Sequence, residues 1–287
     1  MKTPARTRKE IDSEMQISEL LAGVLIERLG VRAKPDLPAI ASRLGMKIRE
    51  VDSEGFDGAL VRAPGHRGGV IAVKASLLDE TRKRFVVAHE IGHFVLPGHG
   101  AMEVCSANHL ETWGLTVPKT ELEANEFAAE LLLPTKHVRE TLAQRFPDLS
   151  AVRRIASEYE TSLTTTTRKF LRVTDHACAM VWSTAGQIVW SERSEAFTPN
   201  LRLGKLDPSA RASELLSSAS ELADNRKTPE FEPRPSRTWL KSLGANAVDR
   251  ILECSVFLPH YNSVLTLLWI EDMGALRLDA DDVASGE

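Results

Sequence analysis

The stretch LLDETRKRFVVAHEIGHFVL, residues 77–96, is the segment on which the predicted fold and the candidate metal site depend. Its apolar residues recur at helical spacing, and a Pro-Gly pair ends the pattern. His89 and His93 are four residues apart, so both imidazoles leave one face of the predicted helix and can bind one metal ion. Imidazole nitrogen suits Zn²⁺. Glu90 lies about 100° around the helix from His89, where it can act as a general base without being a ligand.

A catalytic zinc ion needs a third protein ligand and an open fourth position. The next strong helical pattern, TELEANEFAAELLL at residues 120–133, provides Glu121, which we favour as that ligand. Asn125, one turn further on, is placed to hydrogen-bond a ligating histidine. Glu123 is the competing ligand, although with Thr120 it also matches a capping box that would occupy its side chain. Alternatively, the acidic residues of the first turn only stabilise the helix through their interaction with its dipole.

The whole-chain composition bounds the class of protein. A length of 287 residues predicts about two domains. Hydrophobic residues are 43% and charged residues 26%, as in globular proteins, and no apolar run is long enough to span a membrane. The net charge of −4 excludes a basic field over the whole chain but not a local basic face. Three scattered cysteines and the lack of an apolar leader predict a reduced, cytoplasmic protein without a membrane partner.

Hydrophobic periodicity predicts the other elements of an α+β fold. Helices are expected before the HExxH segment at 17–29 and 37–44, with strands at 46–51, 58–61 and 69–73. A long loop is expected at 97–119, and two helices within 148–172. Beyond about 175, the expected elements are strands at 176–183, 186–193 and within 251–272, a helix at 208–223 and a Pro-rich connector at 224–237.

In the two metal-site segments the chain resembles the ImmA/IrrE family of zinc metallopeptidases. The sequence HEIGH followed by ELEANEFAAELLLP carries the resemblance, which covers residues 16–137 well and the rest loosely. It implies a zincin core of the gluzincin-like type, one Zn²⁺ per chain held by His89, His93 and Glu121, and a catalytic role for Glu90. Leu133 stands where the family often has Met, a mild departure. The family typically cleaves a helix-turn-helix repressor to release stress, mobile-element or phage-defence genes.

The domain organisation that we expect has four parts. A helical element commonly follows the peptidase core in this family, and a GAF- or PAS-like sensor domain would fit after it. The expected parts are a flexible basic tail at 1–14, the zinc metallopeptidase domain at 15–137, a helical helix-turn-helix-like region at 138–174 and a C-terminal α+β sensor-like domain at 175–287.

The loop between the two metal-site helices suggests a means of restraint. Cys105 lies in this loop, and a thiolate is a strong zinc ligand. Cys105 is therefore a candidate inhibitory fourth ligand that would displace the attacking water; the alternative is a small buried apolar residue. His99 and His109 share the loop and would either line a substrate cleft or be solvated.

Two further regions offer binding surfaces. Residues 152–172 resemble a helix-turn-helix, which would contact DNA, or else form a solvated face on the core. Its candidate DNA contacts are Arg153, Arg154, Arg168, Lys169 and Arg172. Three tryptophans of the C-terminal region would line a ligand pocket or fill the core: Trp182, Trp190 and Trp269.

These observations lead to one favoured function and two alternatives. The favoured hypothesis is a zinc-dependent endopeptidase that cleaves a helix-turn-helix repressor, and so induces a stress or phage-defence operon after a DNA-damage signal such as single-stranded DNA. The first alternative is a DNA-binding regulator with a structural zinc site, which four protein ligands would close. The second alternative is a ligand sensor that acts through contact alone.

Overall fold

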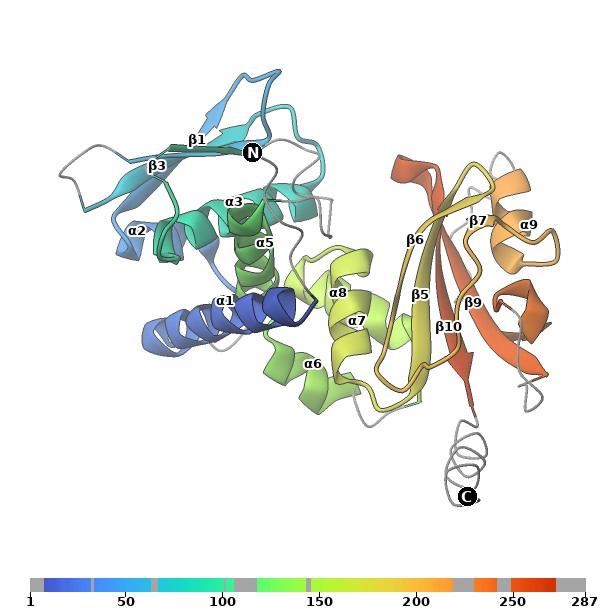
Figure 1. Ribbon diagram of the computed structural model, residues 1–287. Coiled ribbons are helices and arrows are strands. Elements are labelled where there is room, and N and C mark those ends of the chain that lie inside the picture. The colour runs from blue at the N-terminus through green and yellow to red at the C-terminus, as the bar shows by residue number, and fades with distance from the viewer. Residues whose placement is uncertain are drawn as a thin grey trace, which may run out of the picture. The chain divides into compact units, whose positions relative to one another are not determined.

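The computed structural model describes residues 8–31, 34–62, 67–100, 102–105, 118–142, 146–218, 230–241 and 249–271. The chain divides into two compact units (Figure 1): residues 1–135 with 156–162, and residues 136–155 with 163–287. The first unit is mostly helical with a small sheet, and the second is built on an antiparallel sheet, so the expected α+β class is confirmed. The four-part division suggested by the sequence stays a prediction.

The first unit packs helices against one four-stranded sheet. The sheet order is β1-β3-β2-β4, in which β1 and β3 are parallel and the other pairs antiparallel. Its helices are α1 (Arg8–Leu29), α2 (Leu37–Arg43), α3 (Glu80–Val95) and α5 (Lys119–Leu132). Its strands are β1 (Met46–Val51), β2 (Gly58–Val61), β3 (Gly69–Lys74) and β4 (Met102–Cys105).

Most of these elements lie where periodicity predicts them, with two differences. Helix α1 begins at Arg8, so it includes part of the segment for which a tail is expected. Strand β4 lies inside the expected loop at 97–119. Its four residues pair with β2, an interaction between segments distant in sequence that a local pattern cannot reveal.

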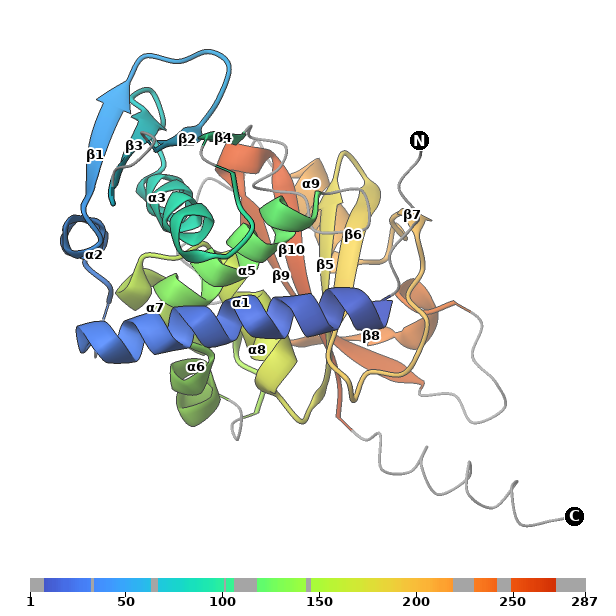
Figure 2. The same ribbon diagram turned by 60° about the vertical axis from the view of Figure 1, so that its left-hand side comes forward.

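Helix α3 owes its bounds to local signals and its position to its buried face. The Asp79 carboxylate accepts hydrogen bonds from the backbone N–H groups of Thr81 and Arg82 at 2.8 and 3.3 Å, which caps the first turn. Its apolar residues enter the core together with those of α5. Figure 2 shows α3 running beneath the small sheet, with α5 on its other side. The HExxH segment is therefore enclosed between a sheet and a second helix.

Gly92 allows α3 and α5 to pack closely. A Cβ atom at Gly92 would lie 3.3 Å from both the Cα and the carbonyl oxygen of Ala124, and 3.2 Å from the Phe127 ring. Two of these three neighbours are backbone atoms, which move only with their helix. Close packing of the two helices thus requires glycine at position 92. The packing offsets the cost of about 1 kcal/mol that glycine carries in a helix interior.

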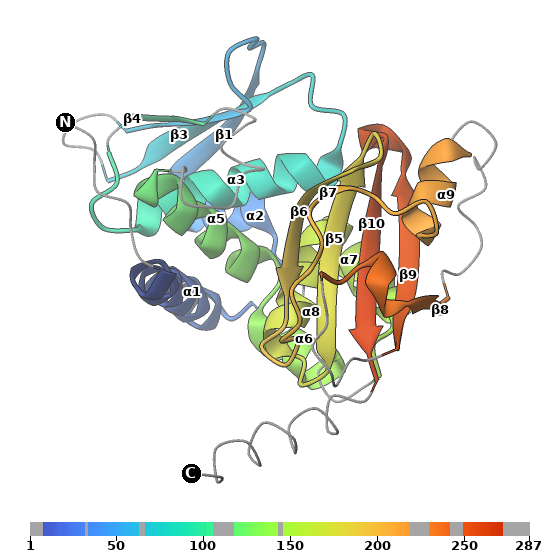
Figure 3. The ribbon, with the colours of Figure 1, turned by 45° about the vertical axis from the view of Figure 1, so that its right-hand side comes forward.

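The second unit is centred on a six-stranded antiparallel half-barrel sheet of order β7-β6-β5-β10-β9-β8 (Figure 3). Helix α8 packs on β5 and β6, and α9 packs on β9 and β10. Its strands are β5 (Ala177–Thr184), β6 (Gln187–Arg193), β7 (Gly204–Lys205), β8 (Glu232–Pro235), β9 (Arg250–Leu258) and β10 (Ser263–Ile270). Its helices are α6 (Thr135–Leu142), the part of α7 (Leu149–Tyr159) before residue 156, α8 (Leu163–Val173) and α9 (Arg211–Ser217).

The second unit differs from the expected elements at α9 and β8. Helix α9 is shorter than the expected span of 208–223. The end of the expected connector contains β8, in which two prolines occupy the outer strand of the sheet. An edge position tolerates proline because no neighbouring strand needs the missing N–H group. Among the described residues, no helix has the length and apolar character that crossing a bilayer requires.

We expect the two helical glycines of the first unit to respond oppositely to alanine. Gly23, within α1, has no atom within 4 Å of its would-be Cβ, so Gly23→Ala should stabilise the protein by about 0.5–1 kcal/mol through helix propensity. Gly92→Ala should be at least about 1 kcal/mol less stable than Gly23→Ala, because the new methyl group forces α3 and α5 apart. Urea unfolding measures both. Equal stabilisation by the two substitutions would show that the helices are not closely packed at Gly92.

Candidate metal centre

Three side chains from two helices converge in the first unit. His89 and His93 come from α3, and Glu121 comes from the first turn of α5. One ligand atom from each lies within 4.8 Å of the other two. The two Nε2 atoms are 3.0 Å apart, and the Glu121 carboxylate oxygens lie 3.4 Å from Nε2 of His89 and 3.5 Å from Nε2 of His93. All three side chains are buried. This is the geometry of three donors around one small cation.

The electrostatics of the cluster favour its metal-binding protonation state. Burial lowers the pKa of His89, although hydrogen bonding to Glu121 opposes the shift. Burial raises the pKa of Glu121, but its hydrogen bonds and charge interactions with the two histidines outweigh this effect, so its pKa is lowered overall. A neutral imidazole and an ionised carboxylate are the forms that bind a metal ion. The donor set of two imidazoles and one carboxylate fits Zn²⁺.

Glu90 lies beside the ligands but is absent from the cluster of three. Its side chain is fully buried on α3. A Cβ atom at Gly58 of β2 would lie 2.7 Å from the Glu90 Oε1 atom and 2.4 Å from Val86. The strand therefore passes directly over the Glu90 carboxylate, which only glycine permits. No sequence pattern distinguishes Gly58 as part of the site, because a glycine at a strand start has many explanations.

The two polar neighbours of Glu121 on α5 have different roles. Asn125 is fully buried one turn after Glu121, and its side chain lies close enough to His89 to oppose the lowering of the His89 pKa, as a residue that orients a ligand would. Glu123 is not part of the ligand cluster; its Oε2 atom lies 3.1 Å from Nε2 of His99. The expected capping box does not form, since α5 follows Pro118 without a side-chain cap.

His99 is the site residue whose position was not anticipated. The chain turns after α3 at Pro97 and Gly98, where Gly98 has a φ of +83°. This turn returns His99 to the site, with Nδ1 2.7 Å from Nδ1 of His93 and no exposed side-chain area. The Pro-Gly turn directly after the helix was the available signal.

Two other predicted residues of this loop lie outside what the structure describes. His109 falls in a part of the chain that is not described, and for Cys105 only the backbone is. That backbone pairs with Gly58 at the end of β4. The role of Cys105 as a fourth ligand stays a prediction.

The predicted DNA contacts are distributed unevenly over α7 and α8. Lys169 is only 2% exposed. Arg168 forms an ion pair with Glu192 at 2.5 Å, and its guanidinium lies 5.7 Å from the centre of the Trp190 ring. Arg153 is half-buried, whereas Arg154 and Arg172 are exposed. Of the five candidates, only Arg154 and Arg172 are exposed on the surface, where a phosphate could reach them.

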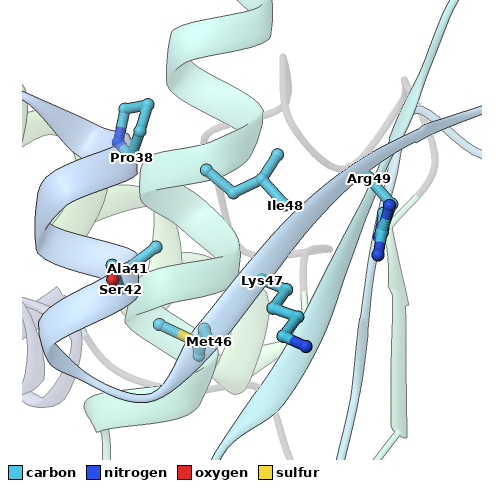
Figure 4. Close-up of a pocket in the computed structure, with 7 residues that line it drawn as sticks. All are labelled: Pro38, Ala41, Ser42, Met46, Lys47, Ile48 and Arg49. Atoms are coloured by element: carbon cyan, nitrogen blue, oxygen red, sulfur yellow. The ribbon is translucent and has the colours of Figure 1, made fainter.

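The three tryptophans predicted to line a pocket or fill the core pack in two aromatic groups. Trp182 and Trp190 are stacked with ring centres 5.9 Å apart. Trp269 contacts Phe146, His176 and Phe231. A separate cavity of about 390 Å³ lies between α2 and β1 of the first unit. Figure 4 draws the residues that line it, and none of them belongs to the metal site.

We expect the free energy of unfolding of the metal-free protein to decrease as the pH is lowered below about 6.5, the ordinary pKa of histidine. The unfolded chain protonates His89 there, whereas burial lowers the pKa of His89 in the fold, so acid favours unfolding by up to about 1.4 kcal/mol per pH unit. His89→Gln should lose this part of the slope between pH 6.5 and 5 in urea unfolding. His176→Gln in the second unit is the control and should keep it. Equal slopes in wild type and His89→Gln would contradict the assignment.

Comparisons with known proteins agree with this geometry. Residues 41–170 match the family described as the IrrE N-terminal-like domain, Peptidase_M78. No curated protein matches the chain. A solved structure described as a Mycobacterium tuberculosis transcriptional regulator is similar, with a TM-score of 0.52 and 13% identity over 91% of this chain and 77% of that chain. At this identity the likeness shows the fold alone. The family match confirms the resemblance seen in the sequence: residues 41–170 form an IrrE N-terminal-like domain of the ImmA/IrrE zinc metallopeptidases, with its candidate metal site at His89, His93 and Glu121.

Proposed function

We propose that the chain is a zinc endopeptidase that cleaves a helix-turn-helix transcriptional repressor and so induces a stress or phage-defence operon. The observation that carries the proposal is a buried glutamate, Glu90, beside a three-ligand metal site in an IrrE N-terminal-like domain. Three protein ligands leave one coordination position for chemistry, whereas structural zinc sites use four. The similarity to a structure described as a transcriptional regulator supports a role in gene control.

The residues of the site divide the work of peptide hydrolysis. His89, His93 and Glu121 would hold the zinc ion, which when bound supplies Lewis-acid polarisation and a lowered water pKa. The Glu90 carboxylate accepts the proton of the attacking water and can return it to the leaving amine. The backbone of β2 at Gly58 covers this carboxylate and keeps bulk water away from it.

The proposal includes a restraint, because a peptidase that induces an operon must stay inactive until a signal arrives. We assign the restraint to Cys105 as an inhibitory fourth ligand. The pairing of Cys105 with Gly58 supports this assignment, since Gly58 lies against Glu90. Single-stranded DNA is the proposed activator, and the exposed Arg154 and Arg172 of the helix-turn-helix-like region are the proposed contacts. The second unit, as a GAF- or PAS-like sensor, would receive or transmit the signal.

Glu90→Gln separates a peptidase from a regulator with a structural zinc site or a contact-only sensor. We expect this variant to bind about one zinc ion per chain, like wild type, because Glu90 is not a ligand. Its cleavage of a candidate helix-turn-helix repressor should fall by about 10²–10⁴-fold, the usual share of a general base. Gel electrophoresis of the repressor, with and without single-stranded DNA, measures cleavage, and metal analysis measures zinc.

Glu80→Gln is the matched control, since Glu80 lies on the same helix and is exposed. It should cleave like wild type. Regulation of the operon by Glu90→Gln at the wild-type level would mean that hydrolysis is dispensable, and the structural-zinc or contact-only function would replace the proposal.

Cys105→Ser tests the restraint by itself. Loss of the thiolate should free the fourth position, so we expect repressor cleavage without added single-stranded DNA. The absorption spectrum of the Co²⁺-substituted protein should also lose its thiolate-to-metal band. Basal cleavage that still needs DNA, with the same Co²⁺ spectrum as wild type, would rule out Cys105 as the restraining ligand.

A further inference from the structure

We propose that His99 and Glu123 form a hydrogen-bonded relay that positions His93 for metal binding. The three groups lie in a row: Nδ1 of His93 is 2.7 Å from Nδ1 of His99, and Nε2 of His99 is 3.1 Å from Oε2 of Glu123. The His99 side chain has no exposed area and the Glu123 side chain is 18% exposed. The row therefore runs from the metal site toward the surface at the start of α5.

Metal binding would fix every proton in this row. Nε2 of His93 faces the other ligands, so it must offer its lone pair to the ion, and the ring proton must then be on Nδ1. That N–H group donates to Nδ1 of His99, which accepts and so leaves the His99 proton on Nε2. This second N–H group donates to the Glu123 carboxylate. One assignment satisfies both hydrogen bonds, and it is the assignment that the ligand role requires.

The geometry excludes His99 as a direct ligand in this arrangement. The two nitrogens of an imidazole lie on different sides of the ring, so a group bonded to Nδ1 of His93 is directed away from the ion at Nε2. The ring centres of His93 and His99 are 4.8 Å apart, and the two ring planes make an angle of 57°. His99 is thus a positioning residue that acts through His93, and Glu123 acts through His99.

The two ligating histidines are supported from different segments. Asn125 acts on His89 from within α5, where it opposes the lowering of the His89 pKa, whereas His93 is supported by His99 in the turn that follows its own helix. Groups that hold a ligating histidine fix its tautomer and ring orientation and raise its basicity, and their loss usually weakens metal binding about 10–100-fold. The relay should therefore affect metal affinity before it affects any other property.

The test is the zinc dissociation constant of the full-length protein, measured by competition with a chelator at fixed pH. His99→Leu fills similar space but cannot accept the His93 hydrogen bond, and we expect it to weaken zinc binding about 10–100-fold. His99→Gln can accept this bond through its side-chain carbonyl and should lose less than about tenfold. The absorption spectrum of the Co²⁺-substituted protein should change in His99→Leu and remain close to wild type in His99→Gln. His176→Gln is the control without effect.

Glu123 provides a second pair of variants that leaves both rings in place. Glu123→Met removes the acceptor and should weaken zinc binding more than Glu123→Gln, which keeps one. This pair carries the test if His99→Leu does not fold. The relay is refuted if the Leu and Met variants bind zinc like wild type, or if each Gln variant is as weak as its apolar partner. The inference rests on the metal site and not on the substrate, so unimpaired function of Glu90→Gln would leave it standing.

Discussion

The close contact between α3 and α5 is the constraint on which the site depends. His89 and His93 belong to one helix and Glu121 to the other, so the three donors meet only if the two helix axes approach closely. Gly92 makes this approach possible by presenting no side chain to the backbone of Ala124. A residue that carries no chemistry thus determines whether the chemistry can assemble. The sheet contributes in the same way from the opposite side, through Gly58 above Glu90.

Enclosing so many ionisable groups between two helices and a sheet has an energetic cost. Burying a charge without a partner is strongly unfavourable, and burying a polar group costs energy unless it is hydrogen-bonded. The first unit lowers this cost by bringing the groups together: Glu121 lies between His89 and His93, His99 contacts Glu123, and Asp57 pairs with Arg82 at 2.6 Å. These polar groups occupy interior volume that apolar side chains would otherwise fill. The remaining apolar contacts between the helices therefore need the tight packing described above.

Local periodicity was sufficient for what depends on neighbours in sequence. The strands β1, β2 and β3 and the helices α3 and α5 lie within a few residues of their predicted bounds, because each has a regular apolar pattern between turn residues. The ligand set was also predictable, since His89 and His93 share one helix face and Glu121 begins the next helix. The remainder depends on contacts between distant segments. Strand β4 exists only through β2, and His99 reaches the site only because a glycine turn reverses the chain.

The origin of the ligands on two helices far apart in the chain has a thermodynamic consequence. An unfolded chain cannot present three such donors together, so a metal ion held by this candidate site would bind the folded state almost exclusively. The free energy of unfolding would then depend on the zinc concentration: at about 100 times the dissociation constant, binding would add about 2.7 kcal/mol to stability. Zinc availability would then set how much of the protein persists folded in the cell, as well as how much of it carries the ion.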